Sequence, residues 1–240
     1  MVTIDGKWVL EGLDRKDPKR IKTSRELSEL VEEIGFLPLF KNHIPGFSVE
    51  ERTLSENWWS GRPEEDPWEW REVIASEGKV AYGKLFCNRA GFISREWYPY
   101  YAVLRRDGYD FDSRYEDGLA SRKHKNIIDV LELRGAIPSY ELKKDAGFHK
   151  EGEKGFEGAI TALQMQTYVL VNSFHRRRSR KNEEYGWSVA DYTLSERYFG
   201  EKHVRSAYSI GTQEALHRII HKLKKHFPSL SNSEAEKIIR

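Results

Sequence analysis

The first hundred residues alternate between helical and strand-like patterns of hydrophobic positions. TSRELSELVEEIGF (23–36) spaces its leucine, valine and isoleucine residues three and four apart, with a capping hydroxyl at its start and a glycine at its end. DPWE (66–69) combines an aspartate cap with proline at the first helical position and predicts a helix to about Ser76. Residues 79–86 and 90–93 are typical of two strands of a hairpin.

A polar connection separates this half from the next. Ser94 begins a further predicted helix, which Pro99 interrupts. The stretch DGYDFDSRYEDGLASRKHK (107–125) is polar and contains glycine, which predicts a long loop or a domain boundary. We therefore expect residues 1–115 to form a helical and hairpin module and residues 116–240 to form a second module.

The second half has a recognisable order of elements. Its hydrophobic pattern predicts helices at 127–135, 139–144 and 156–166, then a strand at 168–174 and a returning strand at 185–192. Three helices followed by a two-stranded hairpin is the order of a winged helix-turn-helix, in which the third helix can lie in the DNA major groove. The hairpin, or wing, then lies beside it. The fold class expected for the chain is mainly α with small β-hairpins (α+β).

The charge of the chain is nearly balanced but unevenly distributed. The formal net charge is only +2, so any affinity for phosphate must come from local clusters. The densest cluster falls where the hairpin is predicted to turn, and such a wing would contact the DNA backbone without reading its sequence. A solvated turn kept soluble by charge is the alternative. The predicted phosphate contacts are His175, Arg176, Arg177, Arg178, Arg180 and Lys181.

Two glutamines precede the predicted wing. If the third helix continues through them, Gln164 and Gln166 lie on opposite margins of its buried stripe. If the backbone becomes extended at Gln164, the pair shares one face with Tyr168 and Asn172, which are then further candidates for DNA contact. A glutamine can orient a water molecule or read an adenine, but it cannot act as a general base at neutral pH. Two polar residues bordering a core helix remain an equal alternative.

Aromatic residues crowd the segment 58–101. Most of them are expected to pack in the core, which is the commoner use of such side chains. Trp58 and Trp59 lie in a polar context beside Gly61, so they are the candidates for stacking on an extruded base.

Other chemistries find little support in the sequence. The presence of a single cysteine, Cys87, excludes a disulfide framework and predicts a cytoplasmic protein. The apolar context of Cys87 predicts a buried thiol. His217 and His221 lie four apart on a predicted amphipathic helix, but no third ligand is indicated, so we expect no metal site. GEKGFEG (152–158) lacks the Lys-Ser/Thr ending of a phosphate loop. No cofactor, nucleotide or membrane span is expected.

Several segments resemble a known family. LQMQTYVLVNSF (163–174) resembles the glutamine-hydrophobic-glutamine motif of the AlkZ family of winged-helix DNA glycosylases, which excise alkylated bases and interstrand crosslinks. DPWEWR (66–71), YGKLF (82–86), RRDGYDFD (105–112) and YGW (185–187) are similar to the smaller bacterial AlkZ-related proteins. The resemblance implies tandem winged helix-turn-helix modules. It also implies that Gln164 and Gln166 position the hydrolytic water and contact the damaged nucleotide.

The expected function is therefore binding of double-stranded DNA, including alkylated DNA. A glycosylase-like role in DNA repair is the first expectation, since a cationic alkylated purine is a good leaving group and an amide-only site can suffice for it. A non-enzymatic DNA-binding regulator would need only the wing and the third helix. A third interpretation is a protein-interaction module that uses the tryptophan-rich half.

Overall fold

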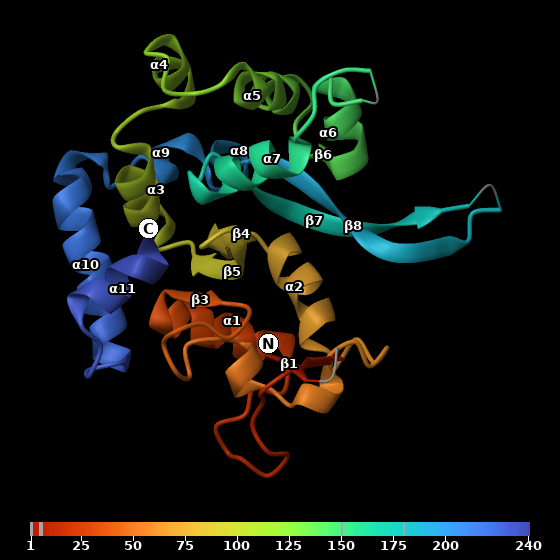
Figure 1. Cartoon of the computed structure of the whole chain (residues 1–240), viewed down its shortest axis with the longest axis vertical. Helices are drawn as coiled ribbons and strands as arrows, with labels where there is room; N and C mark the ends of the chain where they lie inside the picture. Colours follow the sequence, from red (N-terminus) through yellow and green to blue (C-terminus); the bar gives the residue numbers. More distant parts are fainter. Residues whose placement is uncertain (1, 5–6, 150, 180) are drawn as a thin grey trace. The chain divides into compact units, whose positions relative to one another are not determined.

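The computed structural model describes residues 2–4, 7–149, 151–179 and 181–240. The chain forms two compact units (Figure 1). Unit 1 contains Met1–Tyr98 and Leu216–Arg240, and unit 2 contains Pro99–Ala215. This division differs from the expected one at residue 115 because the chain enters the second unit at Pro99 and its last helices return to the first. The polar stretch 107–125 gives no sign that the C-terminal helices pack in unit 1, because that packing depends on residues far away in sequence.

Unit 1 combines short helices with a small antiparallel sheet. The sheet consists of β3 (Phe36–Pro38), β4 (Val80–Phe86) and β5 (Arg89–Ser94), and β5 lies between the other two strands. A two-stranded hairpin, β1 (Val2–Ile4) and β2 (Lys7–Val9), precedes this sheet. The remaining elements are α1 (Ser24–Ile34), the 3₁₀ turns η1 (Glu50–Arg52) and η2 (Ser55–Asn57), and α2 (Pro67–Ser76).

The helices of unit 1 begin where the sequence predicts. The side chain of Thr23 accepts a hydrogen bond from the backbone amide of Glu26 and caps α1, which ends at Gly35 with φ of 95°. Asp66 accepts from the amide of Trp68 at the start of α2. Both predictions are confirmed, because helix capping depends on residues that are close in sequence.

The turn between β4 and β5 exposes the single cysteine. Cys87 and Asn88 have φ of 48° and 61°, and positive φ at both central residues is typical of a type I′ hairpin turn. The thiol of Cys87 is exposed. The expectation of a buried thiol is therefore wrong, because the turn geometry and not the apolar neighbours decides where this side chain points.

The C-terminal segment adds two helices. α10 (Gly211–His226) buries Leu216, Ile219, Ile220 and Leu223, as its amphipathic pattern predicts. α11 (Asn232–Ile239) begins with a capping box in which Ser231 and Glu234 bond reciprocally. The ring of Phe227, just after α10, meets Phe47 edge to face at 5.2 Å. Such contacts place this segment in unit 1.

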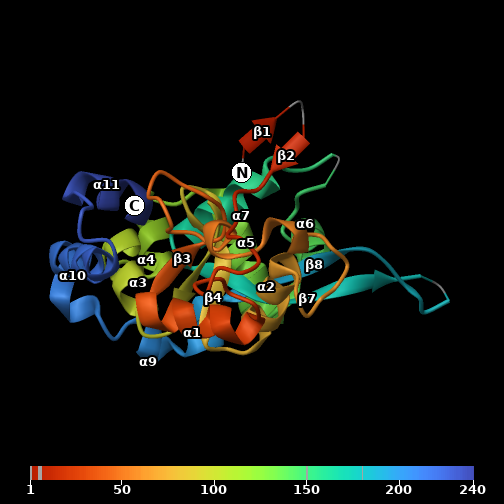
Figure 2. The same cartoon turned by 90° about the horizontal axis from the view of Figure 1, so that it is seen from below.

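Unit 2 has more helix and a longer hairpin. Strands β7 and β8 run side by side and project beyond the helices of the unit in both views (Figures 1 and 2). The strand order is β7-β8-β6, all antiparallel. The elements are α3 (Tyr98–Arg106), α4 (Phe111–Glu116), α5 (Arg122–Arg134), β6 (Ile137–Pro138), α6 (Ser139–Asp145), α7 (Phe156–Met165), β7 (Val169–Arg178), β8 (Glu184–Leu194), α8 (Ser195–Phe199), α9 (Glu201–Val204) and the 3₁₀ turn η3 (Tyr208–Ile210).

Three details of unit 2 differ from the sequence-based prediction. The stretch 107–125 is not one long loop, because Asp110 caps the short helix α4 within it. Pro99 does not interrupt α3, since it lies in the first turn, where its missing amide costs nothing. Residues 176–178 continue β7 instead of forming a turn.

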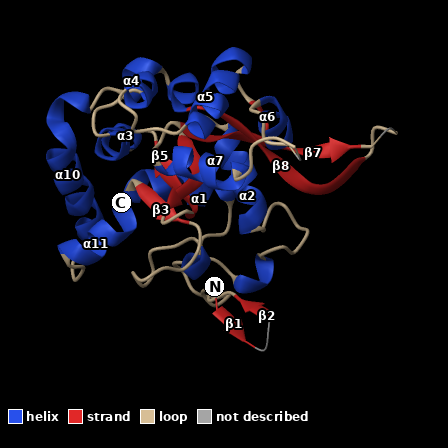
Figure 3. Ribbon diagram, turned by 45° about the horizontal axis from the view of Figure 1, so that its top comes forward, coloured by secondary structure: helices blue, strands red, loops and turns tan. Residues whose placement is uncertain are grey.

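The core of unit 2 lies between α5, α6, α7 and the start of β7. Ile127, Ile128, Leu131, Leu142, Ile160, Leu163 and Val169 belong to one buried cluster. The mixture of helices and antiparallel strands (Figure 3) confirms the expected α+β class.

Candidate nucleic-acid interface

The two glutamines lie at the end of α7, not in an extended segment. The helix continues to Met165, and Gln166 is its C-cap with φ of −77° and ψ of 1°. The helical alternative is therefore the one observed, and the shared face with Tyr168 and Asn172 does not form. Gln164 is only 1% exposed, and its Nε2 donates to the carbonyl oxygen of Ile160 at 3.1 Å. Its side chain is enclosed and supports the helix end.

Gln166 has a different environment from Gln164. Its side chain is partly exposed, but the atom Oε1 is enclosed and finds no hydrogen-bond partner among the described residues. A buried acceptor of this kind is unusual, and an ordered water can satisfy it. Gln166 is thus the member of the pair with a free acceptor.

Two arginines of α3 bond to the backbone around Gln166. Arg105 Nη1 donates to the carbonyl of Met165 at 3.2 Å, and Arg106 Nη2 donates to that of Thr167 at 2.6 Å. Arg106 is fully buried and also bonds Ser195 Oγ at 2.8 Å and Glu196 Oε1 at 2.5 Å. It joins the start of β7 to the residues after β8. Sequence reasoning missed this role, since nothing local marks which arginine of a pair is buried.

Most of the cationic cluster lies along a strand and not at the tip of the hairpin. His175, Arg176, Arg177 and Arg178 belong to β7. Lys181 is exposed in the turn, and Arg180 lies outside the described residues. The expectation of a cluster confined to the tip is corrected, because β7 and β8 pair as far as Arg178 and Glu184.

An aromatic side chain of α6 meets the cations of β7. The guanidinium of Arg177 lies 4.8 Å from the centroid of the Tyr140 ring, and the His175 ring lies 6.3 Å from it, near edge-on. Stacking on an aromatic face restrains an arginine and leaves its N–H groups available in the guanidinium plane. His175 Nδ1 also lies 3.0 Å from Asp191 Oδ1, at ion-pair distance when the imidazole is protonated.

Tyr168 and Asn172 are not exposed in the way expected. Tyr168 is buried in the core of unit 2, and its hydroxyl donates to the carbonyl of Tyr109 at 3.1 Å. Burial raises the pKa of Tyr168 to about 12. Asn172 is a half-buried extra residue in β7, and its amide donates to Ser173 Oγ at 3.2 Å. Tyr168 therefore packs in the core of unit 2, and Asn172 forms part of a β-bulge in β7.

The two candidate tryptophans of unit 1 have separate roles. Trp58 is 5% exposed, and its Nε1 donates to Thr53 Oγ1 at 2.9 Å, so it belongs to the core. Trp59 is 41% exposed and has φ of 55°. Positive φ is an outlier for so bulky a residue. Only Trp59 of this pair presents a face that another molecule can reach.

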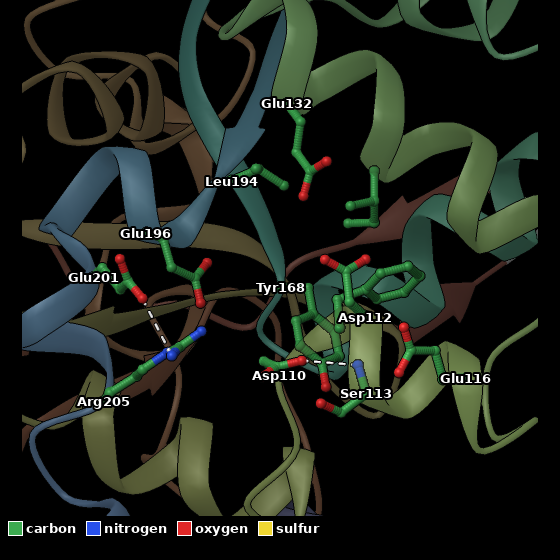
Figure 4. Close-up of a pocket in the computed structure, with 12 residues that line it drawn as sticks. Asp110, Asp112, Ser113, Glu116, Glu132, Tyr168, Leu194, Glu196, Glu201 and Arg205 are labelled. Atoms are coloured by element: carbon green, nitrogen blue, oxygen red, sulfur yellow. Dashed lines mark hydrogen bonds and ion pairs between the residues drawn. The ribbon is translucent and has the colours of Figure 1, made fainter.

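A cavity of about 370 Å³ opens in unit 2 (Figure 4). Tyr168 and Leu194 line it, so it lies at the end of the β7–β8 hairpin away from the tip. Carboxylates dominate its wall, and Arg205, paired with Glu201 at 3.1 Å, is the one basic residue among the described residues that line it. Two of the other carboxylates are also paired, Glu196 with Arg106 and Asp112 with Lys125. Burial raises the pKa of Glu132 in this wall. Such a cavity repels phosphate, so the DNA backbone is expected elsewhere. The acidic lining residues are Asp110, Asp112, Glu116, Glu132, Glu196 and Glu201.

Two further observations concern what the described residues can hold. No three or more histidine, cysteine or carboxylate side chains among them gather as metal ligands would. His217 and His221 stack with their ring centroids 6.5 Å apart on α10, without a third such group in the described part of the chain. Across the same described ranges, no helix has the length and apolar character needed to cross a membrane.

Comparison with known proteins gives one match. The chain matches the family described as AlkZ related over residues 21–240. It matches no curated protein and no solved structure. The match includes unit 1 from residue 21 on and all of unit 2, with the segments DPWEWR and LQMQTY that carry the resemblance in sequence. The protein therefore belongs to the AlkZ-related family.

Proposed function

We propose that unit 2 is a winged helix-turn-helix module that binds double-stranded DNA. Its order of elements, α5, β6, α6, α7, β7 and β8, with β6 pairing to β8, matches that of the fold. α7 then corresponds to the recognition helix and the β7–β8 hairpin to the wing. The side of α7 away from the core carries Glu157, Gly158, Thr161 and Ala162, of which the last three are small enough to let the helix enter a groove.

Unit 1 repeats the same order and supports a tandem arrangement. α1, β3, the turns η1 and η2, α2, β4 and β5 follow one another, and β3 pairs with β5 as β6 pairs with β8. In this comparison α2 corresponds to α7, and the short β4–β5 hairpin corresponds to the long one. Two turns of 3₁₀ helix take the place of the second helix.

The row of cations along β7 carries the proposal. Arg176 and Arg177 are exposed on a hairpin that projects beyond α5, α6 and α7 (Figure 1). The acidic cavity lies at the opposite end of the same hairpin, beside Leu194 and Tyr168. This separation of basic residues from acidic ones favours binding of phosphate along the outer part of the hairpin. Such contacts orient a protein on duplex DNA without specifying sequence.

Excision of an alkylated base is the second function that we propose. Membership of the AlkZ-related family suggests it, and Oε1 of Gln166, which has no hydrogen-bond partner among the described residues, is a group that can hold the attacking water. A cationic alkylated base leaves readily, so an oriented water can suffice without a strong general acid. Gln164 would then act by fixing the end of α7. A regulator without enzymatic activity would bind DNA through the same surfaces and release no base.

Binding of a labelled duplex to the full chain at several salt concentrations tests the first proposal. Phosphate contacts give an affinity that falls linearly with salt on logarithmic axes. Absence of binding, or an affinity that does not change with salt concentration, contradicts the proposal and favours a protein-interaction module. Incubation with a duplex that contains an alkylated purine then separates an enzyme from a regulator, because only the enzyme leaves an abasic site.

A further inference from the structure

Trp187 is unusually exposed for its residue type. It lies in β8 and is 73% exposed, and Tyr185, two residues earlier in the strand, is 53% exposed. Tryptophan is highly buried on average in folded proteins, so an exposed one on a projecting hairpin is informative. The proposed phosphate contacts make no use of either ring.

A bulge in β8 holds the tryptophan. His175 pairs with Val189 and Arg177 pairs with Tyr185, so only Arg176 stands opposite the three residues Gly186, Trp187 and Ser188. Gly186 has φ of 73°, which suits glycine and few other residues. Bulges re-aim side chains at functional positions. Here the bulge coincides with the exposed indole.

The charges around Trp187 limit what can cover it. Arg176 and Arg177 lie on the neighbouring strand, and Glu183 and Glu184 precede Tyr185. A lipid surface or a hydrophobic partner would need a broad apolar face, which this charged hairpin does not offer. A nucleobase is flat and aromatic, and its phosphates suit the arginines. Aromatic rings stack on any base, whereas arginines hold the backbone beside it.

We propose that Trp187 stacks on a nucleobase of bound DNA at a position where the duplex is unpaired or distorted. The proposal rests on the proposed DNA binding of unit 2. A paired base must leave its neighbours before an indole can stack on it, and an unpaired base has already done so. Trp187 therefore makes the protein prefer damaged or mispaired sites over intact duplex.

The test compares two labelled duplexes, one fully paired and one with a single unpaired adenine, by fluorescence anisotropy with the full chain. We expect the native protein to bind the second about tenfold more tightly. Trp187→Ala is expected to remove this preference and to keep the salt dependence of binding to the paired duplex. Trp187→Phe retains most of the preference. Leu133→Ala, which removes another highly exposed apolar side chain of unit 2, changes neither duplex affinity.

Each other outcome has a definite meaning. A preference that survives in Trp187→Ala overturns the stacking role and leaves DNA binding intact. Salt-dependent binding by the native protein with no preference for the unpaired base also overturns it. If neither duplex binds, the proposed function fails together with this inference. Binding to vesicles of anionic phospholipid that requires Trp187, without a preference for the unpaired base, reassigns the ring to a lipid surface.

Discussion

Arg106 Nη2 lies 2.6 Å from the carbonyl oxygen of Thr167, and Arg106 Nε lies 3.2 Å from Thr167 Oγ1. Thr167 has φ of 65°, an outlier for a β-branched residue. It ends α7 in a Schellman motif, where its amide donates to Gln164 and that of Tyr168 donates to Leu163. A buried arginine thus holds a strained residue immediately after Gln166. The position of the glutamines depends on this clamp.

Replacing Arg106 is expected to destabilise unit 2. Arg106→Met leaves the buried oxygens of Thr167 and Ser195 without this donor and Glu196 without its charged partner. Loss of one member of a buried charged network lowers the free energy of unfolding by about 3–5 kcal/mol. Urea denaturation followed by circular dichroism measures this loss.

Arg105 provides the matched control for this experiment. It lies in the same helix but is only partly buried, and it donates to the Met165 carbonyl and stacks on Tyr101. Arg105→Met is expected to cost about 1–2 kcal/mol. Equal costs for the two variants would show that Arg106 is not a clamp.

The two glutamines are expected to differ when replaced. Gln166→Ala should abolish release of an alkylated base, leave DNA affinity within about tenfold and leave stability unchanged, because its Oε1 has no protein partner to lose among the described residues. Gln164→Ala should lower the free energy of unfolding by about 1–3 kcal/mol, since a buried side chain bonded to Ile160 is removed. Base release, duplex affinity and urea denaturation are measured for both variants. Full base release by Gln166→Ala rules the water-holding role out.

Neutralising the wing is expected to weaken DNA binding without unfolding the protein. Arg176, Arg177 and Arg178 changed together to alanine should reduce the slope of log affinity against log salt by about one unit for each phosphate that the variant no longer neutralises. Circular dichroism checks the fold. Arg25→Ala, at a strongly exposed arginine of unit 1 paired with Glu29, controls for charge. Unchanged slope in the triple variant removes the wing from the interface.

Acid is expected to destabilise unit 2 through His124. Burial, and the nearby charge of Arg114, lower the pKa of His124 below 6.5. The unfolded chain then binds a proton that the folded chain resists, so this stability is present above pH of about 6.5 and is lost as the pH falls below it. Thermal unfolding at pH of about 7.5 and about 5.5 measures the loss.

His124→Gln should lose less stability than the native protein between these two pH values. His217→Gln, at an exposed position of α10, should behave as the native protein does. A native-like acid loss in His124→Gln means that another group is responsible.

The sequence predicts elements better than it predicts which side chains are enclosed. α1, α2 and α10 are legible because caps and hydrophobic spacing are local properties of the chain. The burial of Gln164 and Trp58 cannot be predicted in this way, since it depends on residues distant in sequence. The packing of α11 in unit 1 cannot be predicted from the sequence for the same reason.

The candidate interface was predicted in part. A basic hairpin after the third helix was expected, and the hairpin is there, but its strands are longer and the arginines lie along β7. The hairpin is longer because β7 and β8 pair as far as Arg178 and Glu184. The charged residues there do not show the alternating pattern by which a strand is predicted from sequence. The exposure of Trp187 depends on a bulge, and a bulge is a property of two strands in register. No single-strand pattern indicates it.

Hydrogen exchange of the full chain with and without duplex DNA tests most directly whether unit 2 holds DNA between α7 and the hairpin. Backbone amides that a ligand covers or rigidifies exchange more slowly. We expect slower exchange in residues 156–166 and 169–194 when duplex is added. Slower exchange confined to unit 1, or no change with saturating duplex, would contradict it.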